Sequence, residues 1–185
     1  MRMNRRGWLR AAAAAGLWLA LTGHSPYRQF EVHRKMRLVL LASAADPQSV
    51  QLCSALAKIY LQRLPESRAM MARARDGNDL VRLLASRQLE IAVMRATDAH
   101  AALAGLAPYA DNGRVALRAL AELGEHLFVC REELPNGSAY MLIEALAEGW
   151  SGLDPALVRK ASSPRPAATP AIPLHPGAAE YYRDH

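Results

Sequence analysis

Met36-Arg-Leu-Val-Leu-Leu-Ala42 is a short apolar run that predicts a buried β-strand, because it is too brief to form a helix. From this run to Arg95, apolar segments of strand length alternate with longer helical patterns. The expected order is strand, helix, strand, helix, strand, with the later elements over residues 48–64, 67–74, 79–86 and 89–94. This alternation predicts an α/β fold, with a parallel-core sheet and helices on both faces.

More elements are expected beyond the third strand. Thr97 and Asp98 have side chains suited to cap a helix start. Gly124 separates two further apolar runs that read as strands. The expected elements are a helix over residues 99–106, strands over 115–123 and 126–131, and a last helix that starts after a turn within 134–138 and has its apolar positions over 140–150. Residues 36–150 are therefore predicted to form a single α/β domain.

The composition changes after residue 150. Residues 151–171 are rich in Ser, Pro and Ala, which predicts a loosely packed strap. Apolar and aromatic side chains then return over residues 172–185. Such a recovery predicts a C-terminal segment that docks on the domain.

The N-terminus has the pattern of an export signal. Arg5 and Arg6 precede an apolar run over residues 11–21, which favours the twin-arginine route over an ordinary secretory one. The run is shorter than the roughly 20 residues that a transmembrane helix needs. No clean cleavage site follows, so residues 1–25 are a signal peptide or an uncleaved anchor, with 26–35 as a connector. The expected location is periplasmic, either free or tethered to the inner membrane.

The distribution of charge excludes a nucleic-acid partner. The formal charge is +6, but residues 1–25 contain four arginines and no acid, which leaves +2 for the rest of the chain. No basic cluster with interleaved aromatic residues remains. We therefore expect no nucleic-acid surface.

The sequence shows no pattern typical of a catalytic or metal centre. His175 has no partners at metal-ligand spacing, and no serine lies in a nucleophile motif. Cys53 and Cys130 are interpreted as buried thiols, and a disulfide between them stays open because their separation is unknown. We expect no enzyme activity, no cofactor and no metal; the expected mode of action is binding.

The candidate binding site follows from the predicted sheet. Ligands of parallel sheets bind beyond the carboxyl ends of the strands, where arginines can bind carboxylates or phosphates and helix starts add oriented amides. The candidate ligand-binding residues are Ser43, Asp46, Arg73, Arg75, Gly77, Asn78, Arg95 and Thr97. In the alternative reading, the arginines are surface groups paired with Asp76, Asp79 or Asp98, and Asp46 is a plain helix cap.

Several segments resemble one protein family. The tail Ile172-Pro-Leu-His-Pro-Gly-Ala-Ala-Glu-Tyr-Tyr-Arg-Asp184 closely resembles the C-terminal signature of the TAXI family, the periplasmic solute receptors of TRAP transporters. Residues 55–59, residues 81–84 and the third strand are similar in kind and spacing to the family's first lobe. Residues 117–146 resemble its later strands and late helix. The resemblance implies the fold of one lobe of a type 2 periplasmic binding protein.

The chain also departs from the family's pattern. A TAXI receptor holds its solute between two lobes, whereas here the segment that resembles the exit from the first lobe runs directly into the late helix. The second lobe is missing from the pattern. Residues 42–47 replace the family's Gly-rich first loop, residues 74–77 replace its Thr-Gly-Gly-Ser turn, and Arg95 replaces a Gln.

The resemblance implies an exported, solute-binding-like protein with a reduced or altered ligand site. Its expected partners are a small anionic solute of carboxylate type and either the TRAP membrane subunits or a second protein chain. The alternative is a periplasmic protein-interaction or scaffold domain that has lost the solute pocket. A relic without activity is a third reading.

Overall fold

The computed structural model describes residues 37–167 and 172–185. The predicted signal peptide or anchor, the connector and residues 168–171 of the strap lie outside the described residues. No helix in the described part is long and apolar enough to cross a membrane.

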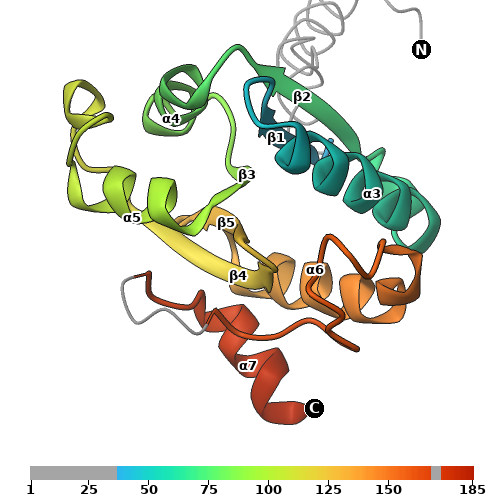
Figure 1. Cartoon of the computed structure of the whole chain (residues 1–185). Helices are drawn as coiled ribbons and strands as arrows, with labels where there is room; N and C mark the ends of the chain where they lie inside the picture. Colours follow the sequence, from blue (N-terminus) through green and yellow to red (C-terminus); the bar gives the residue numbers. More distant parts are fainter. Residues whose placement is uncertain (1–36, 168–171) are drawn as a thin grey trace, which may run out of the picture. The chain divides into compact units, whose positions relative to one another are not determined.

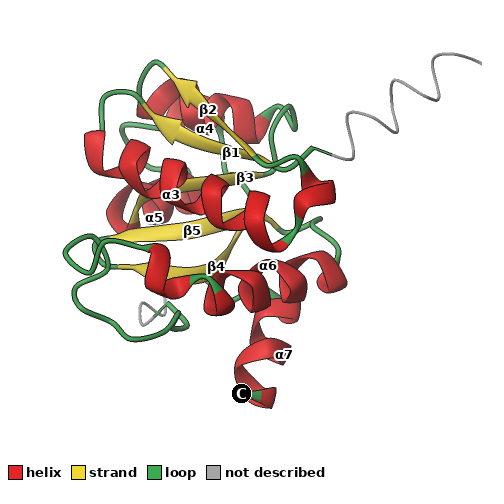
Figure 2. Cartoon of the chain, turned by 90° about the vertical axis from the view of Figure 1, so that its right-hand side faces the viewer, coloured by secondary structure: helices red, strands yellow, loops and turns green. Residues whose placement is uncertain are grey.

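The described residues form one five-stranded sheet (Figure 2). β1 (Val39–Ser43) pairs in parallel with β2 (Met70–Ala74) on one side and with β3 (Ile91–Arg95) on the other. β5 (His126–Arg131) pairs antiparallel with both β3 and β4 (Leu117–Leu123), which gives the order β2-β1-β3-β5-β4. The predicted parallel core is confirmed, and the sheet as a whole is mixed.

The antiparallel half of the sheet results from the tight turn between β4 and β5. Leu123 pairs with His126, so only Gly124 and Glu125 connect the two strands. A two-residue loop joins antiparallel strands, since a parallel pair needs a long crossover. Gly124 has a φ of 71°, a left-handed conformation that glycine adopts without steric cost. The turn therefore brings the first residue of β5 to the edge where β3 ends.

Helices cover both faces of the sheet, as predicted (Figures 1 and 2). One face packs against α3 (Pro47–Arg63), α6 (Asn136–Glu148) and α7 (Pro176–Asp184). The other face packs against α4 (Gly77–Ala85) and α5 (Ala96–Ala104). Short 3₁₀ helices lie at Pro65–Ser67, Ala110–Asn112 and Trp150–Gly152.

The start of α5 differs from the prediction, whereas α6 begins within its predicted start at residues 134–138. α5 starts at Ala96 because Arg95, the last residue of β3, is itself the N-cap. Thr97 lies in the first turn, so the expected cap at Thr97 and Asp98 is wrong. α6 starts directly after Pro135, whose backbone is extended. Because β3 passes into α5 without a loop, Arg95 is fixed at the edge of the sheet.

Side chains of the strands alternate between the two faces. Leu40 and Phe128 belong to the apolar cluster beneath α3 and α6, and Leu41 and Val129 belong to the cluster beneath α4 and α5. All four are fully buried. Because burial of such a side chain stabilises a fold by about 1.5–3 kcal/mol, both faces contribute to stability.

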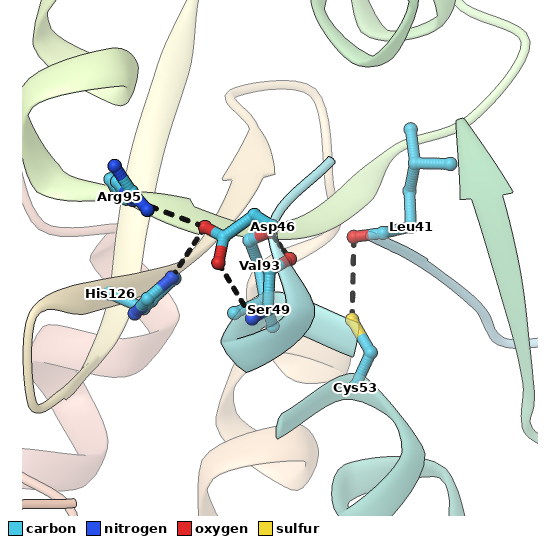
Figure 3. Close-up of polar contacts among 7 residues, drawn as sticks. All are labelled: Leu41, Asp46, Ser49, Cys53, Val93, Arg95 and His126. Carbon is cyan, nitrogen blue, oxygen red and sulfur yellow. Dashed lines mark hydrogen bonds and ion pairs between the residues drawn. The ribbon is translucent and has the colours of Figure 1, made fainter. Parts of the chain in front are cut away.

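The two cysteines are free thiols, which settles the open question of a disulfide. The Cys53 thiol donates a hydrogen bond to the Leu41 carbonyl oxygen at 3.3 Å (Figure 3). Burial raises the pKa of Cys53 to about 12 and also raises the pKa of Cys130. Both are protonated core residues at neutral pH and poor nucleophiles.

The C-terminal segment covers the β4 edge of the sheet. The Ala119 amide donates to the Pro173 carbonyl oxygen at 2.9 Å, and the His175 amide donates to the Ala119 carbonyl oxygen at 2.8 Å. Ile172 and Tyr181 are buried, with 3% and 8% of their surface exposed. α7 packs against α6 (Figure 1).

His175 fixes the start of α7. Its Nδ1 accepts a hydrogen bond from the Gly177 amide at 3.2 Å, and its Nε2 donates to the Leu134 carbonyl oxygen at 2.9 Å. Burial lowers the pKa of His175, consistent with a neutral ring whose Nδ1 is free to accept. A Cβ on Gly177 would collide with the Asn136 carbonyl group, so only glycine fits this contact between α7 and α6.

Candidate ligand site at the carboxyl edge of the sheet

The carboxyl ends of β1, β2 and β3 meet at one edge of the sheet, and antiparallel β5 begins there. Asp46 follows β1, Arg95 ends β3 and His126 starts β5. Figure 3 shows the side chains of Arg95 and His126 directed toward the Asp46 carboxylate. The sequence predicted Asp46 and Arg95 at this edge, and the structure adds His126.

Asp46 binds three groups with its two carboxylate oxygens. Its Oδ1 accepts a hydrogen bond from the Ser49 amide at 3.4 Å, which caps α3. Its Oδ2 lies 2.7 Å from His126 Nε2 and 3.3 Å from Arg95 Nε. The expected role as a helix cap is therefore present, but the same carboxylate also joins β3 and β5.

The pKa of Asp46 is lowered. Burial on its own would raise the pKa, because the side chain is only 14% exposed. The interactions with His126, the Ser49 amide and Arg95 together outweigh burial, and those with His126 are the largest of them. Asp46 is therefore ionised at neutral pH.

His126 is buried where α3 meets the sheet. It lies on the same face of β5 as Phe128, and 1% of its side chain is exposed. Its Nδ1 is buried without a hydrogen-bond partner among the described residues. Because a carboxylate oxygen can only accept, His126 Nε2 is the donor in its contact with Asp46. Ser49 supports this junction, since its hydroxyl donates to the Val93 carbonyl oxygen at 2.7 Å.

The start of α4 is occupied by the chain's own acids. Asp76 Oδ1 accepts from the Asp79 amide at 2.8 Å, and Asp79 Oδ2 accepts from the Arg75 amide at 3.1 Å. Asp79 also pairs with Arg82, whose hydrogen bond is the main reason for the lowered pKa of Asp79. The predicted anion position near Gly77 is therefore already filled by carboxylates.

Tyr109 lies against Gly77, the first residue of α4. Its hydroxyl lies so near Gly77 that a Cβ there would approach it to 2.6 Å. The pKa of Tyr109 is raised to about 12, first by burial and then by the charge of Asp98 and a hydrogen bond to Asp98. Asp76 acts in the same direction and Arg95 in the opposite one. Tyr109 therefore sits among the charged groups of this edge.

The start of α5 has no side-chain cap. The Ala96 amide donates to the Glu125 carbonyl oxygen at 3.2 Å, and Thr97 is exposed in the first turn. The Arg95 side chain is 59% exposed, and its only ion pair among the described residues is with Asp46 through Nε. The Arg95 guanidinium therefore remains accessible to an anion, while the Ala96 amide is already bonded.

The remaining candidates do not converge on this cluster. Ser43 is buried at the end of β1, while Arg75 and Asn78 are exposed. Arg73 lies on the α3 face of β2, in a separate depression. The three arginines thus do not form one site, and the partner of Arg95 is Asp46 instead of Asp76, Asp79 or Asp98.

Sequence reasoning missed His126 and Tyr109. A signal for His126 exists in the short connection at Gly124, because a two-residue turn starts the second strand at the end of the sheet where the first strand finishes. No comparable signal marks Tyr109, which lies in a loop. The described part of the chain holds no group of His, Cys, Asp or Glu residues suited to bind a metal ion.

No protein-family model matches the chain, and no curated protein matches it in sequence.

Proposed function

We propose that this protein is an exported, non-catalytic binding protein that resembles a TAXI receptor of a TRAP transporter, with a reduced site for a small anionic solute. The α/β sheet with helices on both faces supports this proposal, since it is consistent with one lobe of a type 2 periplasmic binding protein. The TRAP membrane subunits are its proposed partners.

The exposed guanidinium of Arg95 at the uncapped start of α5 carries the proposal. Only Nε faces Asp46, which leaves the two terminal nitrogens for a carboxylate held by two parallel hydrogen bonds. The amides of the first turn add partial positive charge at the same place. Thr97 offers a hydroxyl beside them.

The open geometry limits affinity. Exposed ion pairs contribute about 0–1 kcal/mol each, whereas micromolar binding requires about 8 kcal/mol. Asp46 further weakens the field of Arg95 toward an incoming anion. The isolated monomer is therefore expected to bind small carboxylates with a dissociation constant of about 1 mM, the equivalent of about 4 kcal/mol.

Calorimetry with sodium succinate on the full chain, verified as a monomer, tests this prediction. We expect weak binding that salt diminishes and that Arg95→Gln abolishes. Arg73→Gln is the matched control, because the structure places Arg73 on another surface. Submicromolar affinity would show an enclosed site, and equal effects of the two substitutions would remove Arg95 from the site.

A second candidate function is a protein-interaction domain that has lost the solute pocket. The observation that favours it is that Asp46, Asp76 and Asp79 already satisfy the starts of α3 and α4. A partner protein, and no small anion, would then raise the melting temperature. The two functions are thus separated by which kind of molecule stabilises the chain.

A further inference from the structure

The outermost strands of the sheet, β4 and β2, differ in what covers their outer sides. The β4 edge is covered by backbone hydrogen bonds to Pro173 and His175, whereas β2 has no strand on its outer side among the described residues (Figure 2). The Met70 amide donates a hydrogen bond to the Leu38 carbonyl oxygen, so the backbone amide of Met70 faces the β1 side. In a parallel ladder alternate residues face opposite sides, and the amides of Met71 and Arg73 therefore face outward.

The surface beside β2 is basic. A shallow depression of about 450 Å³ lies along the exposed side of α3 and next to β2. Lys58 and Arg73 line it together with Gln51 and Gln62, and no acid does. Neither Lys58 nor Arg73 forms an ion pair within the part of the chain that the structure describes.

The two faces of β2 have different chemistry. Arg73 lies on the α3 face together with Met71, which packs into the cluster under that helix. Ala72 and Ala74 lie on the α4 face, and Met70, which is 46% exposed, has the same parity. A strand added to β2 would therefore meet positive charge on one face and apolar side chains on the other.

We propose that β2 is a docking edge for an extended acidic segment of a partner protein, in which acidic and apolar residues alternate. The partner's backbone pairs with Met71 and Arg73, its acidic side chains meet Lys58 and Arg73, and its apolar side chains meet Met70. This edge is separate from the Arg95 site and does not depend on it.

Charge distinguishes this occupant from two others. Antiparallel pairing of two copies through β2 would place the two Arg73 side chains opposite or diagonal to each other within this five-residue strand, and like charges on paired strands are destabilising. Residues 1–36 hold seven Lys and Arg residues against a single acid, Glu31, so they do not complement Lys58 and Arg73. Arginine on an edge strand thus opposes self-pairing and selects acidic partners.

The test uses the full chain and a capped ten-residue peptide of alternating Glu and Val. We expect amide NMR shifts at Met71 and Arg73 on binding, and a loss of affinity of about tenfold in the double variant Lys58→Glu, Arg73→Glu. Arg183→Glu is the control, since Arg183 is an exposed arginine on α7. A peptide with Lys in place of Glu should not bind.

Backbone pairing is tested separately by methylating alternate peptide nitrogens, which leaves the protein unchanged. Methylation in the register that faces β2 should abolish binding, and methylation in the other register should not. The proposal is overturned if charge reversal leaves affinity unchanged, or if both registers tolerate methylation. It is also overturned if Met71 and Arg73 amides exchange slowly in the free chain, as covering by residues 1–36 or by a second copy would require.

Discussion

Asp46 shows how much one side chain determines at the candidate site. It caps α3, neutralises Arg95 and holds His126, so the same carboxylate links β1, β3 and β5. The sequence marks the cap, because Asp before Pro47 is a helix-start signal. The sequence also placed Arg95 at this end of the sheet, but its pairing with Asp46 and the arrival of His126 could not be predicted, since they depend on the order and direction of strands that are distant in sequence.

The Asp46 interactions predict a specific acid sensitivity. A carboxyl group with a lowered folded pKa stabilises the fold at pH values above its unfolded pKa of about 4, and this stability is lost as the pH falls through the folded value. Asp46→Asn keeps a helix cap but removes the charge. We expect it to cost about 1–3 kcal/mol at pH 7 and less at pH 3.

Urea unfolding at pH 7 and pH 3 measures this difference. Asp111→Asn is the matched control, because Asp111 is an exposed carboxyl group without an ion pair among the described residues. The same loss for Asp46→Asn at both pH values would show that its charge does not stabilise the fold.

The helices and strands were predicted more reliably than the connections between them. The sequence pattern is sufficient to predict β1, β3, β5 and α3, because each of these elements buries side chains at a regular spacing. The start of α5 was missed since β3 runs into it without a turn residue. The sequence predicted that residues after the parallel strands would meet at one end of the sheet. Arg73 does not join them because it lies on the α3 face, and His126 was missed because it comes from an antiparallel strand.

The contact between α6 and α7 predicts opposite effects for two neighbouring glycines. A Cβ at Gly177 would overlap the Asn136 carbonyl group, while a Cβ at Gly137 in α6 meets nothing within 4 Å. Gly177→Ala should therefore destabilise the fold by about 1–3 kcal/mol through overpacking. Gly137→Ala should stabilise it by up to about 1 kcal/mol, because alanine favours helix. Thermal unfolding of both variants gives the comparison, and equal effects would contradict the close approach.

At the scale of the whole molecule, the two outer strands of the sheet differ: the C-terminal segment covers β4, whereas no described segment pairs with the outer side of β2. The C-terminal segment bonds along β4 and places α7 on α6, so residues distant from the parallel core complete the apolar cluster on that face. β2 at the opposite side carries one charged residue, Arg73, with Lys58 of α3 beside it, and such charges discourage pairing. This asymmetry predicts that the tail contributes to the stability of the domain, and it is the basis of the proposed docking at β2.

Deletion of residues 172–185 tests this dependence on the tail. It removes the buried anchors Ile172 and Tyr181, each worth about 1.5–3 kcal/mol, and also exposes the β4 edge at Ala119. Total stabilities are about 5–15 kcal/mol, so we expect the melting temperature to fall by about 10 °C or more, or cooperative unfolding to be lost. Deletion of residues 184–185 is the control, because it removes the exposed end of α7 and the stacking of His185 on Tyr181 but leaves both buried anchors and the β4 hydrogen bonds in place. If the chain with the longer deletion melts like the parent chain, the tail does not stabilise the domain.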